Sequence, residues 1–202
     1  SGTPVPYDLY VPTSYAPSTP APLVCLFHGQ GDTGANIVSF WQATAEANGF
    51  LVLATTSTGT SGGWSGTDVD LFSAALDDAT RAYDVDRARI YVWGFSAGAH
   101  LVHAVALMNT DLFAAYGVNA GVLAYFAGTD APSLAARHIP LIDIDGTSDP
   151  LYTYIPGDHT AFLSAGWTDG TNLDFESFAG GHELRPEHPG QVWAFLSRFT
   201  LP

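Results

Sequence analysis

Short apolar runs alternate along the chain with longer segments of helical periodicity. The continuous apolar runs at 23–27 and 50–54 are typical of strands that are buried on both faces of a sheet. Segments 36–48 and 68–83 repeat apolar residues at helical spacing, and Asn36 is the expected N-cap of the first. Because strands and helices alternate, the pattern predicts a mostly parallel sheet flanked by helices.

The same alternation continues to the end of the chain. Polar and apolar residues alternate at 7–11, as in an edge strand, and the prolines of segment 12–22 predict a connection. Further strands are expected at 90–93, 116–119, 140–144 and 173–178, and further helices at 97–108, 155–166 and 189–199. The short stretch between 119 and 140 leaves little room for a lid. We therefore predict that residues 1–202 form a single α/β domain with a minimal lid or none.

Composition narrows the range of partners. The chain has 20 acidic residues against six basic ones, which gives a net charge of −14. This balance argues against nucleic acid and anionic membrane surfaces, because both require a basic face. No apolar run is long enough to span a bilayer. We expect a monomer without a nucleic-acid or membrane partner, and a secreted protein, with the cytoplasm as the alternative location.

Cysteine and histidine do not form a metal or redox motif in this sequence. The single cysteine, Cys25, falls within the predicted strand 23–27, where a small packing role is expected. His100 and His103 follow one another along a predicted helix, but no further ligands are marked nearby. We therefore expect no metal and no cofactor.

The run Gly-Phe-Ser-Ala-Gly at 94–98 connects a predicted strand directly to a predicted helix. This order suits a nucleophilic serine, because a strained turn lifts the Ser96 hydroxyl out of the sheet edge. Small residues at Gly94 and Gly98 let the chain pass, and the Ala97 N–H at the helix start can meet an oxyanion. A glycine–serine turn without chemistry is the alternative interpretation.

A second oxyanion donor is predicted in the glycine loop 28–32, which follows the strand 23–27. We assign this donor to the backbone N–H of Gln30. His28 is expected to brace the loop, since it precedes Ser96 in the chain.

A serine hydroxyl needs a base to take its proton. In proteins with a nucleophilic serine on a strand–turn–helix of this kind, the acid follows the serine in the chain and the histidine follows the acid. His182 follows the last predicted strand and is the predicted base, with His188 as the alternative. Asp149 lies on the loop after strand 140–144 and is the predicted acid, with Asp145 as the alternative. The acid would hold the imidazole and stabilise the imidazolium.

Together these motifs resemble the α/β-hydrolase superfamily, and within it the compact bacterial esterases grouped with polyhydroxybutyrate depolymerases and feruloyl esterases. The resemblance is carried by segments 26–29, 83–98, 112–115, 145–150 and 180–182. It implies a three-layer α/β-hydrolase fold, with Ser96 as nucleophile, Asp149 as acid and His182 as base. Asp145 stands where that group often has histidine. The loop 28–34 also resembles the carboxylesterase and acyl-thioesterase branch.

The sequence therefore predicts a serine carboxylic-ester hydrolase that acts on short-chain, aryl or polymeric esters, the last of polyester or feruloyl type. An acyl-thioesterase, a peptidase or amidase on the same fold, and a non-catalytic binding module are the alternatives. Trp64, Phe95 and Tyr152 are expected to contribute an apolar substrate-binding surface, and packing in the core is the alternative role for each.

Overall fold

A computed structural model describes residues 6–202 of the chain. These residues form a seven-stranded sheet in the order β1-β3-β2-β4-β5-β6-β7. Neighbouring strands are parallel, except that the edge strand β1 runs antiparallel to β3. The strands are β1 (Asp8–Tyr10), β2 (Ala21–Phe27), β3 (Leu51–Ala54), β4 (Val85–Phe95), β5 (Ala115–Asn119), β6 (Leu141–Gly146) and β7 (Leu173–Phe178).

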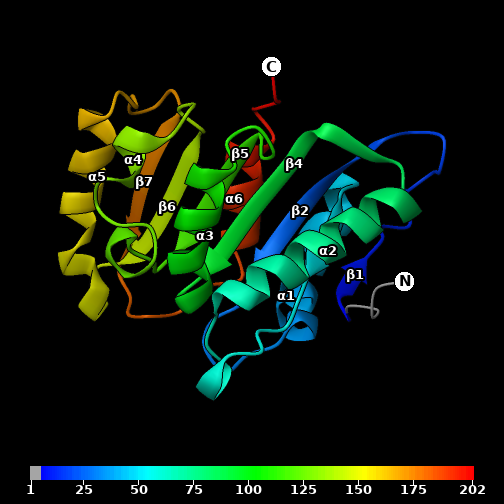
Figure 1. The fold of residues 1–202 in the computed structure, drawn as a ribbon, viewed down its shortest axis with the longest axis horizontal. Coiled ribbons are helices and arrows are strands. Elements are labelled where there is room, and N and C mark those ends of the chain that lie inside the picture. The colour runs from blue at the N-terminus through cyan, green and yellow to red at the C-terminus, as the bar shows by residue number, and fades with distance from the viewer. Residues whose placement is uncertain (1–5) are drawn as a thin grey trace.

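Helices cover both faces of this sheet (Figure 1). The α-helices are α1 (Gly34–Asn48), α2 (Gly66–Ala82), α3 (Ala97–Met108), α4 (Ala131–Leu134), α5 (Ile155–Ser164) and α6 (His188–Leu196). Helices α2, α3 and α5 lie on the near face in this view, and α1 and α6 lie behind the sheet. Short 3₁₀ turns form η1 (Thr60–Gly62), η2 (Leu123–Tyr125) and η3 (Pro150–Thr153). The prediction of a three-layer fold with a mostly parallel sheet is confirmed.

Aromatic side chains fill the core between the sheet and the layer of α1 and α6. Trp41 of α1 is fully buried and packs edge-on against Phe50 and Trp93, with ring centroids 6.3 and 5.2 Å apart. Phe50 in turn stacks on Trp193 of α6 at 4.1 Å. Aromatic pairs of this kind add to the stabilisation from buried area. This packing holds the strands in place, and the strands in turn position the loops at the edge of the sheet.

Two predicted boundaries near the N-terminus are wrong. Strand β2 begins at Ala21 and includes Pro22, although prolines 12–22 predicted a connection. Its pairing with β4 shifts register between Ala21 and Leu23, and a proline is tolerated at such an irregularity. The N-cap of α1 is Thr33, whose side chain accepts the backbone N–H of Asn36, so Asn36 lies inside the helix.

Local capping also moves the start of α2. Ser65 and Asp68 form a reciprocal capping box, and the helix begins at Gly66 rather than at residue 68. Strand β4 runs from Val85 to Phe95, longer than the predicted 90–93, because its early residues still pair with the start of β2. The predicted bounds of α3 and β7 agree with the structure.

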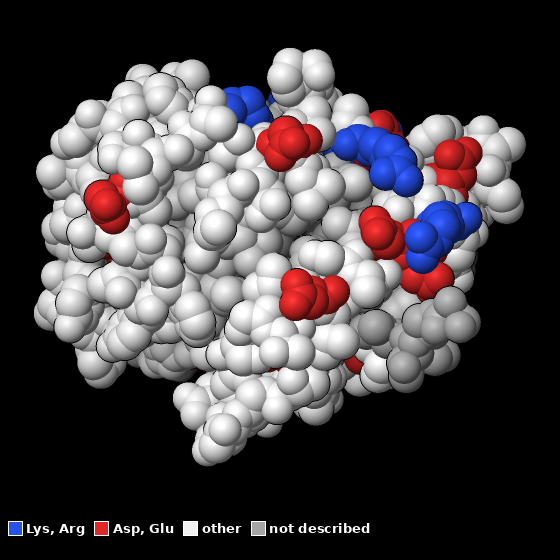
Figure 2. All heavy atoms as spheres, viewed as in Figure 1, with Lys and Arg blue, Asp and Glu red and all other residues white. Residues whose placement is uncertain are grey.

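Charged side chains are spread unevenly over the face shown in Figure 2. Many lie to the right, over α2 and the start of β4, whereas the surface over α3 and α4 carries few. Exposed apolar side chains occur on that neutral surface, among them Met108, Phe126 and Leu134. Within residues 6–202, no helix has the length and apolar character that crossing a bilayer requires.

Candidate active site

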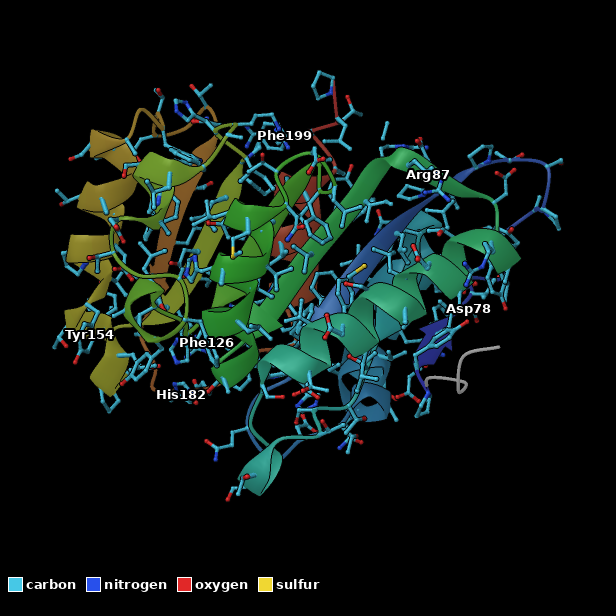
Figure 3. All side chains as sticks on the ribbon, viewed as in Figure 1. Asp78, Arg87, Phe126, Tyr154, His182 and Phe199 are labelled. Atoms are coloured by element: carbon cyan, nitrogen blue, oxygen red, sulfur yellow. The ribbon has the colours of Figure 1, made fainter. Side chains whose placement is uncertain are left out.

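The parallel strands deliver the predicted site residues to one edge of the sheet. Gln30, Ser96, Asp149 and His182 all lie on loops that follow the carboxyl ends of parallel strands, namely β2, β4, β6 and β7. In open α/β sheets this edge is where ligands bind. Figure 3 shows His182 at this end of the molecule, together with Phe126 from the loop after β5.

Ser96 occupies a strained turn between β4 and α3. Its φ of 53° and ψ of −119° lie in a backbone region that residues other than glycine rarely adopt. A Cβ on Gly94 would lie 2.6 Å from the backbone of Gly98, and a Cβ on Gly98 would lie 2.2 Å from the carbonyl oxygen of Phe27. The flanking glycines therefore allow the tight approach of the strand, the turn and the helix.

Three side chains from separate loops form a continuous hydrogen-bonded chain. The Ser96 Oγ lies 2.7 Å from Nε2 of His182, and Nδ1 of His182 lies 2.6 Å from Oδ2 of Asp149. An ionised carboxylate only accepts, so Nδ1 carries the proton and Nε2 is free to accept from the serine. The buried Asp149 is held by the backbone N–H of Leu151, which donates to Oδ1 at 2.8 Å.

Backbone contacts join the acid loop to the histidine loop. The N–H of Ser148 donates to the carbonyl of Gly180 at 2.8 Å, and that of Thr147 donates to Phe178 at 2.9 Å. A Cβ on Gly146 would lie 2.2 Å from the carbonyl oxygen of Gly181. This close packing fixes the position of the acid relative to the neighbouring imidazole.

His188, the alternative base, lies outside this chain of contacts. It is 1% exposed, and its Nδ1 accepts from Nδ2 of Asn119 at 3.1 Å and from the backbone N–H of Arg185 at 3.2 Å. Asn119 also accepts from the indole of Trp93 at 2.7 Å and, through its carbonyl, from the N–H of Ser96 at 2.9 Å. His188 thus ties the histidine loop to the strand beside the serine.

The two predicted oxyanion donors flank Ser96. Ala97 opens α3, and Gly29 is close enough that an added Cβ would lie 3.6 Å from the Ser96 Cβ, which places the Gln30 loop beside the serine. Within residues 6–202, no protein acceptor takes the backbone N–H of Ala97 or Gln30. Both donors therefore remain available for an anionic oxygen.

Trp64 was predicted to contribute to a substrate-binding surface, but it lies in the core, which was the alternative role. It is 7% exposed, its ring packs against Phe27 at 4.9 Å, and its indole N–H donates to the carbonyl of His28 at 2.9 Å. His28 is fully buried, and its Nε2 accepts from the backbone N–H of Ser57 at 3.0 Å. Both rings hold the glycine loop, as expected for His28.

The other two predicted substrate contacts lie in different places. Phe95 is half-buried, and its ring centroid is 5.3 Å from that of His182, at the edge of the site. Tyr152 instead lines a cavity of about 220 Å³ with Phe175 and His159, between α5 and the edge strand β7. Phe95 remains a candidate substrate contact. Tyr152 lines a cavity that contains none of Ser96, Asp149 and His182, so the predicted substrate contact of Tyr152 is not supported.

His100 and Tyr125 are site neighbours that the sequence analysis did not select. The backbone N–H of His100 donates to the carbonyl of Ser96 at 3.0 Å, one helical turn along α3. Nδ1 of His100 accepts from the backbone N–H of Val122. The ring of Tyr125, which is 60% exposed, packs on the imidazole with the ring centroids 4.5 Å apart. Burial lowers the pKa of His100, so the ring is neutral. Two features of the sequence could have pointed to these residues. His100 lies four residues after Ser96 on a predicted helix, and Tyr125 follows a predicted core strand.

The remaining candidates for metal or redox chemistry are packing residues. Cys25 is fully buried, and burial raises the pKa of its thiol. Burial lowers the pKa of His103 to about 3, and its Nδ1 lies 3.4 Å from the hydroxyl of Tyr116. In the part of the chain that the structure describes, no three His, Cys, Asp or Glu side chains converge as metal ligands would.

Solved structures with the same architecture include a ferulic acid esterase, with a TM-score of 0.77 over 95% of this chain and 90% of that one, at 15% identity. The protein has the α/β-hydrolase fold. A feruloyl esterase module from Clostridium thermocellum, solved as an S954A mutant with sinapinate, matches with a TM-score of 0.74 at 17% identity, over 94% of this chain and 78% of that one.

Sequence comparisons give partial matches to other proteins. The model of the prolyl oligopeptidase family matches residues 57–137 of this chain. The bifunctional acetylxylan esterase/xylanase XynS20E of Neocallimastix patriciarum is 26% identical over 151 residues, 72% of this chain. NocK of Nocardia uniformis subsp. tsuyamanensis, named as an esterase, is 29% identical over 150 residues, 67% of this chain. The matches span 22% and 43% of those relatives, less than half of each.

Proposed function

We propose that the protein is a carboxylic ester hydrolase that works through an acyl-enzyme on Ser96. The observation that carries this proposal is the hydrogen-bonded chain from Ser96 through His182 to Asp149, with the serine in a strained turn. A neutral hydroxyl is a poor nucleophile unless a base takes its proton, and Nε2 of His182 is placed to do so. The esterases among the relatives support the same assignment.

The proposed reaction has two halves. In the first, Ser96 attacks the ester carbonyl, its proton passes to Nε2 of His182, and the N–H groups of Ala97 and Gln30 hold the oxyanion. The imidazolium then protonates the leaving alcohol, which leaves an acyl ester on the serine. In the second half, His182 takes a proton from water as the water attacks the acyl ester, and it then gives that proton to the departing Oγ of Ser96, which releases the acid and restores both side chains. Asp149 holds the imidazole and stabilises its charge throughout.

The proposed substrates are uncharged esters, including esters on a polymer. One relative is named as an acetylxylan esterase and one similar solved structure as a ferulic acid esterase, and these names suggest an acetylated xylan or a ferulic acid ester as the substrate. The exposed Tyr125 beside His100 and the neutral surface over α3 offer an open, uncharged approach to Ser96. A net charge of −14 disfavours an anionic polymer.

Hydrolysis of p-nitrophenyl acetate, butyrate and octanoate by the wild type and by Ser96→Ala tests this proposal. We expect turnover of at least one ester, and a loss of several orders of magnitude in the variant. The trend with chain length measures the acyl pocket. Equal turnover by the folded Ser96→Ala protein would refute the proposed nucleophile.

A peptidase or amidase activity is the second candidate, because the matching family model is that of a peptidase family. The same triad cleaves amides when the leaving amine is protonated and the substrate is held in place. A proline p-nitroanilide and a p-nitrophenyl ester should be compared as substrates. A higher kcat/KM for the anilide would replace the esterase proposal with this one.

A further inference from the structure

Residues 57–65, the support loop, follow β3 and pack against the glycine loop. Strands β2 and β3 are parallel neighbours, so the loops that follow them leave the same edge of the sheet. The backbone N–H of Gly31 donates to the carbonyl of Gly62 at 3.0 Å, and the side-chain amide of Gln30 donates to the carbonyl of Ser61 at 3.3 Å. An added Cβ on Gly62 would lie 2.6 Å from Cα of Gly31, so the two backbones are in direct contact.

The support loop also holds the start of the glycine loop. The backbone N–H of Ser57 donates to Nε2 of His28 at 3.0 Å, and the indole N–H of Trp64 donates to the carbonyl of His28 at 2.9 Å. The hydroxyl of Ser57 donates at 3.0 Å to the carbonyl of Gly62, the same carbonyl that Gly31 uses. The support loop therefore contacts the glycine loop on both sides of the predicted oxyanion donor.

A single carboxylate joins the two ends of the support loop. Asp68, in the first turn of α2, is 1% exposed. Its Oδ1 accepts from the backbone N–H and the hydroxyl of Thr58, at 2.8 and 2.7 Å. Its Oδ2 accepts from the backbone N–H and the hydroxyl of Ser65, both at 2.8 Å. Burial opposes the charge of Asp68, but these four hydrogen bonds outweigh it and lower its pKa below the ordinary value.

We infer that Asp68 is a positioning residue for the oxyanion step, because by closing the support loop it holds the Gln30 N–H in place beside Ser96. The inference rests on the proposed function, in which that N–H binds the oxyanion. Asp68 touches no reacting atom and acts through the backbone of the two loops. A donor stabilises a developing charge best when it is already fixed before the reaction, since no reorganisation is then needed in the transition state.

Asp68→Asn tests this inference. The new NH₂ group would face a backbone N–H in place of an acceptor, so one end of the support loop would be released. Removing an oxyanion donor altogether costs about 10²-fold to 10³-fold in kcat, and we expect a displaced donor to cost about 10-fold to 100-fold. The fall in kcat should be the same for p-nitrophenyl acetate, butyrate and octanoate, with KM changed less than about twofold. A distorted acyl pocket would instead change the trend with chain length.

Two further variants separate this role from a general weakening of α2. Leu76→Val removes a buried methylene from the same helix but keeps the Asp68 carboxylate and its four hydrogen bonds, so kcat should not change. Thr58→Val removes only one hydroxyl donor from Asp68, and it should lower kcat in the same direction by a smaller factor. An equal loss of kcat in Leu76→Val and Asp68→Asn would overturn the inference.

Amide hydrogen exchange provides a readout that does not depend on turnover. The N–H of Gly31, which is bonded to Gly62, should exchange at least about tenfold faster in Asp68→Asn than in the wild type or Leu76→Val. Faster exchange with an unchanged kcat, or a lower kcat with unchanged exchange, would overturn the inference and leave the esterase proposal intact. If the wild type hydrolyses none of the three esters, the esterase proposal fails. The exchange of Gly31 then decides alone, since faster exchange supports the role of Asp68 and unchanged exchange refutes it.

Discussion

Oδ2 of Asp149 lies 2.6 Å from Nδ1 of His182, and Oδ1 of the same carboxylate accepts from the backbone N–H of Leu151. One oxygen is thus fixed by the backbone while the other fixes the imidazole. The buried carboxylate therefore selects the tautomer in which Nε2 faces Ser96 without a proton.

Replacing Asp149 with asparagine should reverse that tautomer. An amide nitrogen facing Nδ1 would favour the proton on Nε2, which could no longer accept from Ser96. We expect kcat to fall by about 10³-fold to 10⁴-fold with little change in KM. Ester kinetics measure the effect, and the circular dichroism spectrum of the variant checks that it is folded. A loss smaller than about tenfold would contradict the orienting role of Asp149.

Ser96→Gly should abolish hydrolysis and yet stabilise the fold. The serine sits at φ 53°, where a Cβ is strained and glycine is not. We expect the free energy of unfolding to rise by about 1 kcal/mol relative to Ser96→Ala, which also lacks the hydroxyl but keeps the Cβ. Denaturant unfolding of both variants measures the difference. Equal stability of the pair would mean that the turn stores no strain.

Gly146→Ala should impair catalysis from outside the triad. The new methyl group would lie 2.2 Å from the carbonyl oxygen of Gly181 and would push the loop that carries His182 away from Ser96. We expect kcat to fall at least tenfold, since a misplacement of about 1 Å costs roughly 10²-fold.

Gly190→Ala is the matched control for that change. Gly190 lies in α6, and an added Cβ there meets no atom within 4 Å. Alanine favours a helix over glycine by about 1 kcal/mol, so this variant should keep its activity and gain slightly in stability. Similar kinetics for Gly146→Ala and Gly190→Ala would show that the close packing at Gly146 does not position His182.

The stability of the protein should fall as pH rises toward neutrality, in part because of Asp145. Asp145 is 1% exposed on β6, and this burial raises its pKa from 3.8 to about 7, so the native state binds more protons than the unfolded chain between these values. The resulting stabilisation is complete below about pH 4 and is lost as pH rises through about 7.

Asp145→Asn should remove this contribution. From about pH 5 to about pH 8, the free energy of unfolding of the wild type should fall relative to the variant by on the order of 2 kcal/mol. Urea unfolding at the two pH values measures this difference. Parallel pH dependences of the two proteins would argue against a buried, protonated Asp145.

The periodicity of the chain was enough to predict the layered fold, because buried parallel strands and amphipathic helices are local patterns. The tight turn at Ser96 could also be predicted, because Gly94 and Gly98 lie between a predicted strand and a predicted helix and leave room for the chain to turn there. Helix starts were predicted less well, because Thr33 and Ser65 act as caps through hydrogen bonds that composition does not distinguish.

Only the tertiary structure decided which polar residues meet. The sequence left His188 open as a base and Asp145 as an acid, and the choice depended on contacts between β5, β6 and the loop after β7, segments far apart in the chain. Trp64 could not be distinguished from a surface aromatic, because its burial depends on packing against Phe27 and His28. The local sequence thus determined the order of strands and helices and the tight turn at Ser96, whereas long-range packing determined which side chains meet at the site.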